Sequence, residues 1–215
     1  MPAAGTSTKS DERRRAIVAA AMACFAQKGF YGTTTHELAE RVGISQPYLY
    51  RLYPNKEALF AAVVDHVSVV MTETLVAHSP ASGGAGLTSE AASGGAGPAS
   101  EAASGGAGPA SEAASGGAGP ASEAALDAAR GAYAALIADR TILRFLMHAN
   151  CAAGEPLVGE AVRRCYAKQV DTVRRLLGDD DAVRRWFGAG MLDNVVAVLG
   201  LADIDEPWAH VLAAR

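Results

Sequence analysis

The chain has 215 residues, of which 50% are hydrophobic and 20% are charged, and its formal net charge is -4. An acidic chain of this kind is not a general nucleic-acid coat protein. The charge is unevenly divided, however, because residues 1–56 contain eight lysines and arginines against four acidic residues, whereas residues 57–215 contain eleven against nineteen. This division predicts a basic N-terminal part that is attracted to phosphate and an acidic remainder that is not.

Cysteines and apolar segments narrow the classes of protein further. Cys24, Cys151 and Cys165 lie on apolar helical stripes, with no C-x-x-C motif and no His/Cys cluster. They are typical of small buried hydrophobic residues in a reducing compartment, so we expect no metal and no cofactor. The first ten residues lack the apolar core of a signal peptide, and no uninterrupted apolar run approaches the roughly 18 residues of a membrane span. We therefore predict a soluble, cytoplasmic protein that does not contact a membrane.

Residues 1–10 are predicted to form a disordered arm, and a first helix starts near Asp11. Its apolar residues recur at spacings of three and four and form one stripe. Gly29 follows the cation Lys28 and is expected to end this helix. The stripe consists of Ile17, Ala20, Ala21, Cys24 and Phe25.

Two shorter helices follow, joined by a glycine turn. Thr34 and Glu37 match a capping box, which predicts the start of the second helix. Gly43 allows a sharp turn with positive φ, and Ser45 is a favourable N-cap for the third helix. Pro47 lies in the first turn of the third helix, where its missing N–H costs little. This pattern predicts a helix-turn-helix domain over residues 11–56.

Side chains at the amino end of the third helix are the candidate DNA contacts. Leu49 and Leu52 are the expected core anchors, so the neighbouring tyrosines cannot all point inward. A lone tyrosine is more often buried, and we expect this of Tyr53. Lys56 lies where a lysine is unfavourable against the helix dipole, unless an anion such as phosphate binds there. The predicted DNA-contacting residues are Thr34, Thr35, Ser45, Gln46, Pro47, Tyr48, Tyr50, Arg51 and Lys56.

These residues also carry a family resemblance. The segments GFYGTTT, GIS and LYRLYPNKEALF, with the apolar stripe before them, resemble the N-terminal domain of the TetR family of transcriptional regulators, over roughly residues 13–60. Val42 and Tyr53 depart mildly from the family pattern, which often has alanine and phenylalanine there. Gln46, Pro47 and Tyr48 occupy its most variable positions, so the operator sequence does not transfer. The resemblance implies a sequence-specific regulator with an effector pocket and a homodimeric, near-palindromic mode of binding double-stranded DNA.

An eleven-residue repeat interrupts the helical pattern. Residues 82–125 contain SGGAGLTSEAA once and SGGAGPASEAA three times. Glycine and proline in each unit prevent a continuous helix, so we predict a flexible linker over residues 80–125. A short connection is the family pattern, and expansion of a repeated unit in the gene would produce the insert without selection for function.

The remaining segments are all helical in their periodicity, and no stretch alternates with period two. We expect a connecting helix over residues 57–79 and an effector-binding and dimerisation domain over residues 126–215. The fold class is therefore all-α, with an N-terminal three-helix domain and a TetR-like C-terminal domain. Further helices are predicted at residues 122–138, 141–152, 156–177 and 180–199, with a short one starting at Pro207.

Two sites are expected in this C-terminal domain. The helix over residues 180–199 is apolar over more than one face, which favours pairing with a second copy of itself, and it resembles the helix through which TetR-type regulators dimerise. The residues assigned to this dimer interface are Val183, Phe187, Met191, Val195 and Val198. The resemblance also implies an effector pocket for an unknown small molecule, although each candidate lining residue is more often ordinary core. The candidates are Met71, Tyr133, Phe145, His148, Asn150, Cys151 and Tyr166.

The leading hypothesis is a ligand-responsive, homodimeric repressor; the same sequence is compatible with an activator. An enzyme is not expected, because the chain has no nucleophile elbow, H-E-x-x-H motif or dinucleotide fingerprint and its five histidines are scattered. The other alternative is an all-α dimeric module that binds another protein and keeps a vestigial DNA-binding head.

Overall fold

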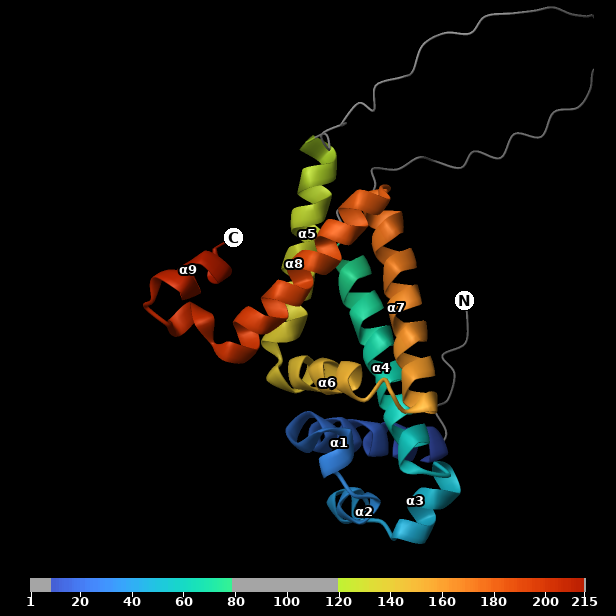
Figure 1. Ribbon diagram of the computed structural model, residues 1–215. Coiled ribbons are helices and arrows are strands. Elements are labelled where there is room, and N and C mark those ends of the chain that lie inside the picture. Colours follow the sequence, from blue (N-terminus) through green and yellow to red (C-terminus); the bar gives the residue numbers. More distant parts are fainter. Residues whose placement is uncertain (1–8, 79–119, 215) are drawn as a thin grey trace, which may run out of the picture.

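The computed structural model describes residues 9–78 and 120–214, and this part of the chain is built from α-helices and one short 3-10 helix, without a strand. The all-α prediction is thereby confirmed. Three helices form a head at one end of the molecule, and the remaining helices form a body above it (Figure 1). The head consists of α1 (Lys9–Gly32), α2 (Thr35–Val42) and α3 (Gln46–Leu52).

The body begins with α4 (Lys56–Ala77), which runs from the head into the centre of the molecule alongside α7 (Figure 1). Asp139 caps α6 and Asp179 caps α8 through side-chain oxygens that accept backbone N–H groups, which is why acidic residues begin these helices. The other helices are α5 (Pro120–Ala138), α6 (Arg140–Cys151), α7 (Pro156–Leu177), α8 (Asp180–Leu199), the 3-10 helix Leu201–Asp203 and α9 (Pro207–Ala213).

The start of α5 differs from the predicted linker boundary at residue 125. The helix already begins at Pro120, inside the last repeat unit. Proline fits the first turn of a helix, and the following SEAA is made of residues that propagate one, so this unit continues into the next helix. The rest of the predicted linker and most of the predicted N-terminal arm lie outside the described residues.

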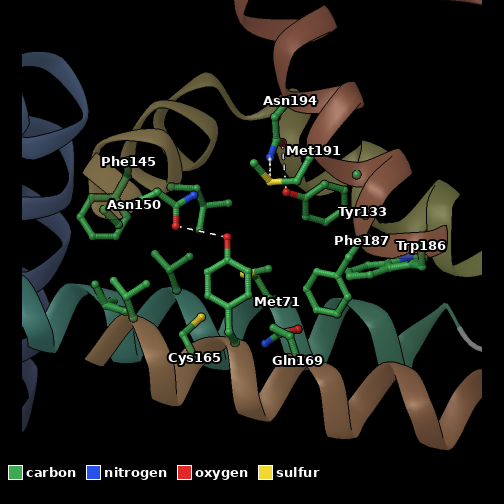
Figure 2. Close-up of a pocket in the computed structure, with 17 residues that line it drawn as sticks. Met71, Tyr133, Phe145, Asn150, Cys165, Gln169, Trp186, Phe187, Met191 and Asn194 are labelled. Atoms are coloured by element: carbon green, nitrogen blue, oxygen red, sulfur yellow. Dashed lines mark hydrogen bonds between the residues drawn. The ribbon is translucent and has the colours of Figure 1, made fainter. Parts of the chain in front are cut away.

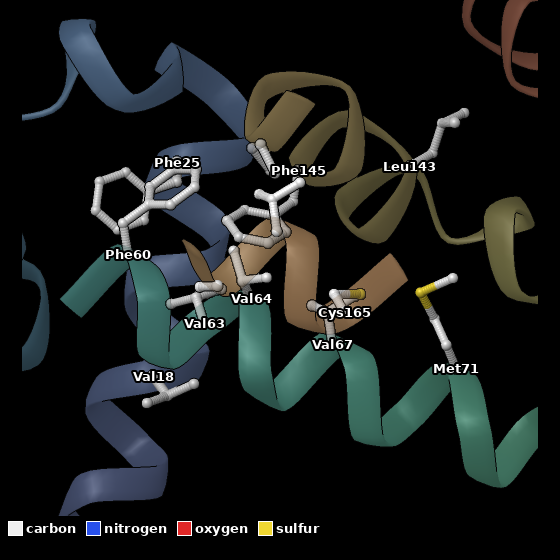
Figure 3. Packing of buried hydrophobic residues seen from close by; sticks show 14 of the residues in the cluster. Val18, Phe25, Phe60, Val63, Val64, Val67, Met71, Leu143, Phe145 and Cys165 are labelled. Atoms are coloured by element: carbon white, nitrogen blue, oxygen red, sulfur yellow. The ribbon is translucent and has the colours of Figure 1, made fainter. Parts of the chain in front are cut away.

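One hydrophobic core joins the head to the body. Phe25 of α1, Phe60 of α4 and Phe145 of α6 are fully buried (Figure 3). The Phe60 ring lies 4.7 Å from the Phe25 ring and 5.0 Å from the Phe145 ring, measured between centroids. Aromatic side chains bury large areas, so this chain of rings ties α1 firmly to α4 and α6.

The composition of α4 is unusually apolar. By length and mean hydropathy, α4 would be apolar enough to cross a membrane, although Asp65 and Glu73 interrupt its apolar sequence. In the structure, residues such as Leu59, Val63 and Val67 are buried between α1, α5 and α7. A helix that is surrounded by other helices is hydrophobic on most sides for the same reason as a membrane span, and α4 is such a core helix here.

Candidate nucleic-acid interface and ligand pocket

The turn between α2 and α3 is formed by local capping interactions. Thr34 accepts a hydrogen bond from the backbone N–H of Glu37 at 3.2 Å, and Ser45 accepts one from the backbone N–H of Tyr48 at 3.3 Å. Gly43 ends α2 in the left-handed region, with φ 73° and ψ 36°. The capping residues predicted from the sequence therefore define the helix-turn-helix geometry.

Polar side chains connect the amino end of α3 with the start of α2. Gln46 Nε2 donates to Thr35 Oγ1 at 2.8 Å, and Thr35 Oγ1 lies 2.9 Å from the Tyr50 hydroxyl. Gln46 and Thr35 are half-buried, whereas Tyr50 is exposed. This network fixes the direction of Gln46 and leaves part of each side chain at the surface, where a binding partner can reach it.

Tyr48 lies between two arginines. The guanidinium groups of Arg51 and Arg13 lie 4.6 and 5.7 Å from the centre of its ring. The pKa of the Tyr48 hydroxyl is lowered, first by its hydrogen bond with Arg13 and then by Arg51. Pro47 beside it is exposed, and Tyr48 is half-buried rather than interior. The amino end of α3 thus presents an aromatic ring that is flanked by positive charge, which suits a polyanion.

Lys56 has a position that the sequence did not predict. Its Nζ donates to the carbonyl oxygens of Phe30 at 2.9 Å and Thr33 at 3.3 Å, and it lies 4.3 Å from the centre of the Phe30 ring. A cation beside the carbonyls that end α1 is favourable, which explains a lysine at the start of α4 without an anion. The phosphate contact of Lys56 stays a prediction. The ammonium group has three N–H donors and uses two of them in these hydrogen bonds, so one donor is left for a phosphate.

Tyr53, which was expected in the core, is buried. Burial raises the pKa of its hydroxyl, and nearby Arg14 opposes that shift. Lys28 Nζ donates to the Glu37 carboxylate, and this hydrogen bond lowers the pKa of Glu37. Together these contacts hold α1 against α2 and α3.

The body contains a pocket between α4, α5, α6, α7 and α8 (Figure 2). Its empty volume, which includes its opening to solvent, is about 640 Å³. Five of the seven predicted lining residues surround it: Met71, Tyr133, Phe145, Asn150 and Tyr166. The Tyr166 hydroxyl donates to Asn150 Oδ1 at 3.2 Å, and both side chains are exposed.

His148 and Cys151 do not line this pocket, so their assignment to it was wrong. His148 lies on the opposite face of α6, and a Cβ atom added to Gly29 of α1 would lie only 2.9 Å from its Nδ1. Cys151 is exposed at the end of α6. Both errors have one cause, since a run of candidate residues along α6 was assigned to a single face although helical periodicity divides it between two.

Three polar residues of the pocket were missed. Gln169, Trp186 and Asn194 line it and are almost completely buried. Tyr133 donates to Asn194 Oδ1 at 3.0 Å, and burial raises the pKa of Tyr133 to about 12. The available signal was Gln169 itself, because a glutamine in the apolar stripe of α7 must bury a polar amide.

The predicted dimer residues on α8 divide into two groups. Val183 is buried in the hydrophobic core of the chain, and Phe187 is half-buried, with its ring 6.0 Å from that of Tyr166. Val183 is therefore not accessible to a second copy of the chain, whereas the assignment of Phe187 to the dimer interface stays a prediction. The exposed apolar side chains of α8 are Met191, Leu192, Val195, Val198 and Leu199, with exposed fractions of 37–57%, and they recur at spacings of three and four.

Among residues 9–78 and 120–214, no cluster of three or more His, Cys, Asp or Glu side chains is arranged to hold a metal ion.

A helix-turn-helix head on an all-helical body with a pocket is the architecture of a helix-turn-helix regulator. Comparisons with known proteins identify the family that it resembles. The profile of "Bacterial regulatory proteins, tetR family" matches residues 17–63.

Curated relatives match segments of similar length. The HTH-type transcriptional regulator RutR of Escherichia coli (strain K12) is 40% identical over 55 residues, which is 26% of each chain. The HTH-type transcriptional activator FasR of Mycolicibacterium smegmatis is 35% identical over 60 residues, 28% of this chain and 27% of FasR. The HTH-type transcriptional repressor AcnR of Corynebacterium diphtheriae is 33% identical over 70 residues, 33% of this chain and 37% of AcnR. The matched part thus spans about a quarter to a third of these relatives.

The fold extends the likeness to the body. A transcriptional regulator from Pseudomonas aeruginosa PAO1 has a TM-score of 0.59 at 18% identity, covering 96% of this chain and 89% of that one. A TetR-family regulator from Mesorhizobium loti has a TM-score of 0.53 at 17% identity, with 96% and 93% covered. Residues 17–63 therefore form a DNA-binding domain of the TetR type, and the likeness over the rest of the described chain is one of fold.

Proposed function

We propose that this protein is a sequence-specific DNA-binding regulator of transcription, in which α3 enters the major groove and its amino end contacts base edges. The observation that carries this proposal is the position of Gln46 and Tyr48. They lie half-exposed at the start of α3, within the segment that matches the TetR profile. Recognition helices of helix-turn-helix proteins contact bases with these first residues.

The chemistry of the head supports separate roles for its residues. The Gln46 amide can pair with both N6 and N7 of adenine, provided that it leaves Thr35, so we assign base reading to Gln46. Arg13 and Arg51 flank Tyr48 and are assigned to the phosphate backbone, together with the exposed side chain of Thr34. The net positive charge of residues 1–56 would add attraction at long range.

The proposed assembly is a homodimer that pairs through α8. An apolar stripe on a surface helix normally has a partner, and a second copy of α8 offers the same stripe. Two heads related by two-fold symmetry would bind a near-palindromic operator with half-sites about one helical turn apart. Repression follows most directly, since a bound dimer occupies the DNA; activation is the alternative, and the protein would act in the cytoplasm.

The pocket is proposed as the site of a small-molecule effector. It is lined by α6, which packs against α1, and by α4, which leads directly to α3. An effector that binds the DNA-free conformation more tightly than the DNA-bound one would release the operator. The other hypothesis, a protein-interaction module with a vestigial head, is less favoured because the caps of α2 and α3 and the Gln46–Thr35–Tyr50 network are intact.

The test is selection of bound sites from a random DNA library, followed by gel shift with the selected sequence. We expect a near-palindromic site, and Gln46→Ala should relax preference at one position per half-site at a cost of about 1–3 kcal/mol. Gln27→Ala is the matched control, since Gln27 is exposed on α1 away from α3. Absence of a selected sequence with the wild-type protein would favour the interaction module instead.

A further inference from the structure

The orientation of one buried amide determines what the pocket offers a ligand. Gln169 Nε2 donates to the carbonyl oxygen of Ser68 and to Thr72 Oγ1, each at 3.2 Å. The Thr72 hydroxyl itself donates to Ser68 O at 2.8 Å, so both of these α4 atoms present lone pairs to Gln169. The reversed amide would place two oxygens against each other, and its NH₂ group is therefore fixed toward α4.

This orientation leaves Gln169 Oε1 without a donor among the described residues, although the side chain is 1% exposed. In Figure 2 the Gln169 oxygen lies on the side of Phe187, within the group of residues that line the pocket. A buried acceptor that lost water on folding and gained no partner is costly. The oxygen has almost no accessible surface, so a ligand N–H or O–H group would reach it, and recover that cost, only by displacing neighbouring side chains.

A buried donor complements this acceptor. Trp186 lines the same pocket and is 3% exposed, and its indole Nε1–H has no acceptor in the part of the chain that the structure describes. Nearby, Asn194 Nδ2 has only a distant contact, 4.0 Å from the sulfur of Met191. The pocket therefore combines one unsatisfied acceptor with donors suited to a carbonyl oxygen.

The rest of the lining limits the ligand to a neutral molecule. Every residue that the structure places around this pocket is uncharged, and five of them are aromatic. A charged group in such surroundings would lose its hydration without gaining a counter-ion. Aromatic walls instead favour a planar, largely apolar ring.

We infer that the pocket binds a neutral aromatic molecule that carries both an N–H or O–H donor, for Gln169 Oε1, and a carbonyl-type acceptor, for Trp186 Nε1 or Asn194 Nδ2. The inference rests on the proposed function only in taking this ligand as the effector. The binding chemistry itself concerns the body of the protein and is measured without DNA.

Three compounds of nearly equal shape test this chemistry on the full-length protein. Benzamide has the donor and the acceptor, acetophenone replaces the donor by a methyl group, and benzoate carries a negative charge and no donor. Affinities come from titration calorimetry, and binding is located by the indole N–H signals in ¹H–¹⁵N spectra. The chain has two tryptophans, so a Trp208→Phe variant assigns the signal of Trp186.

We expect benzamide to bind and to shift the Trp186 signal but not that of Trp208. Acetophenone should bind about three- to tenfold more weakly, because the hydrogen bond to Gln169 is lost. Benzoate should bind at least about tenfold more weakly than benzamide. No measurable binding of benzamide, or benzoate binding as tightly, overturns the inference.

A substitution of Gln169 tests whether this residue causes the difference in affinity between benzamide and acetophenone. Gln169→Leu should weaken benzamide to the level of acetophenone and leave acetophenone unchanged, whereas Gln27→Leu on the surface of α1 should change neither. Equal loss for both compounds overturns the role of Oε1. If Gln169→Leu does not fold, the three-compound comparison on wild-type protein still decides the inference. Failure here would not affect operator binding, and failure of the site selection would not affect these affinities.

Discussion

The helix-turn-helix and the pocket of this protein differ in how far apart in sequence their hydrogen-bond partners lie. In the helix-turn-helix, side chains bond to residues close in sequence: Thr34 caps Glu37, Ser45 caps Tyr48, and Gln46 reaches Thr35 eleven positions away. In the body, Tyr133 bonds to Asn194, 61 positions away. The amide of Gln169 reaches back 101 positions to Ser68 and still leaves one buried atom without a partner.

The comparisons also differ between regions. The family profile matches residues 17–63, which include the caps of the helix-turn-helix. The likeness to the regulator from Pseudomonas aeruginosa, which covers 96% of this chain, is one of fold at 18% identity. Under the proposed function, the way of reading DNA would depend on the head, and the ligand chemistry on the body.

The largest expected effect comes from disrupting the proposed dimer, which is formed by the body but should determine how tightly the two heads bind the operator. Val195→Arg places a charge in the middle of the exposed stripe of α8, and we expect a monomer in sedimentation velocity. Operator affinity should fall about a hundredfold or more, because the two heads are no longer linked. Val69→Arg is the matched control, as Val69 is 43% exposed on α4, compared with 37% for Val195. If both variants remain fully associated, α8 is not the interface.

A second variant acts where the head meets the body. Gly29 has φ 71° and ψ -178°, a region that is essentially restricted to glycine, and it lies against His148. Gly29→Ala should lower the free energy of unfolding by about 1–3 kcal/mol in denaturant titration. Adding His148→Ala should recover only the part that arises from the contact.

Gly131 provides the control for this substitution, since it lies within α5, has no positive φ, and would place its Cβ in open space. Gly131→Ala should be neutral or stabilising by up to about 1 kcal/mol. Equal effects of the two substitutions would contradict the strain at Gly29.

Lys56→Met distinguishes a structural role from a DNA contact. Loss of the hydrogen bonds to Phe30 and Thr33 should lower stability by about 1 kcal/mol. If Lys56 also holds a phosphate, the salt dependence of operator binding should decrease by about one unit of slope, relative to the exposed Lys168→Met. An unchanged slope together with lower stability would restrict Lys56 to closing the turn after α1.

The smallest effect concerns the contact between Lys28 and Glu37 at the surface of the head. Lys28 holds the pKa of Glu37 below its ordinary value of 4.5. The contact therefore stabilises the folded state above that pH, and the contribution is lost as pH falls through the lowered pKa. Glu37→Gln should reduce the melting temperature slightly at neutral pH, and the reduction should shrink as pH falls through the lowered pKa of Glu37, by circular dichroism. A larger difference in acid than at neutral pH would reverse this assignment.

The sequence predicted the features that depend on near neighbours. Thr34, Gly43 and Ser45 have few alternatives at their positions, since a cap or a left-handed turn demands particular residue types. The helix predicted over residues 122–138 starts two residues earlier in the structure, at Pro120. The all-α class followed from periodicity alone.

Features that depend on distant contacts were not predictable in the same way. Nothing near Lys56 in sequence shows that its ammonium reaches the end of α1, and nothing near His148 shows that its ring lies against Gly29. The lack of hydrogen-bond partners for Gln169 Oε1 and Trp186 Nε1 likewise depends on how α4 and α8 pack around α7. Such features need the tertiary structure, because periodicity gives the buried face of a helix but not what covers it.

Met191 has a consequence for the proposed assembly, because its side chain lines the pocket and is also 44% exposed on the outer stripe of α8. A molecule that displaces Met191 changes the surface available to a second subunit. Thermodynamic reciprocity then requires that subunit association changes the affinity for that molecule by the same factor. The apparent sensitivity of the regulator would accordingly vary with its own abundance in the cell, so that mass action tunes the response.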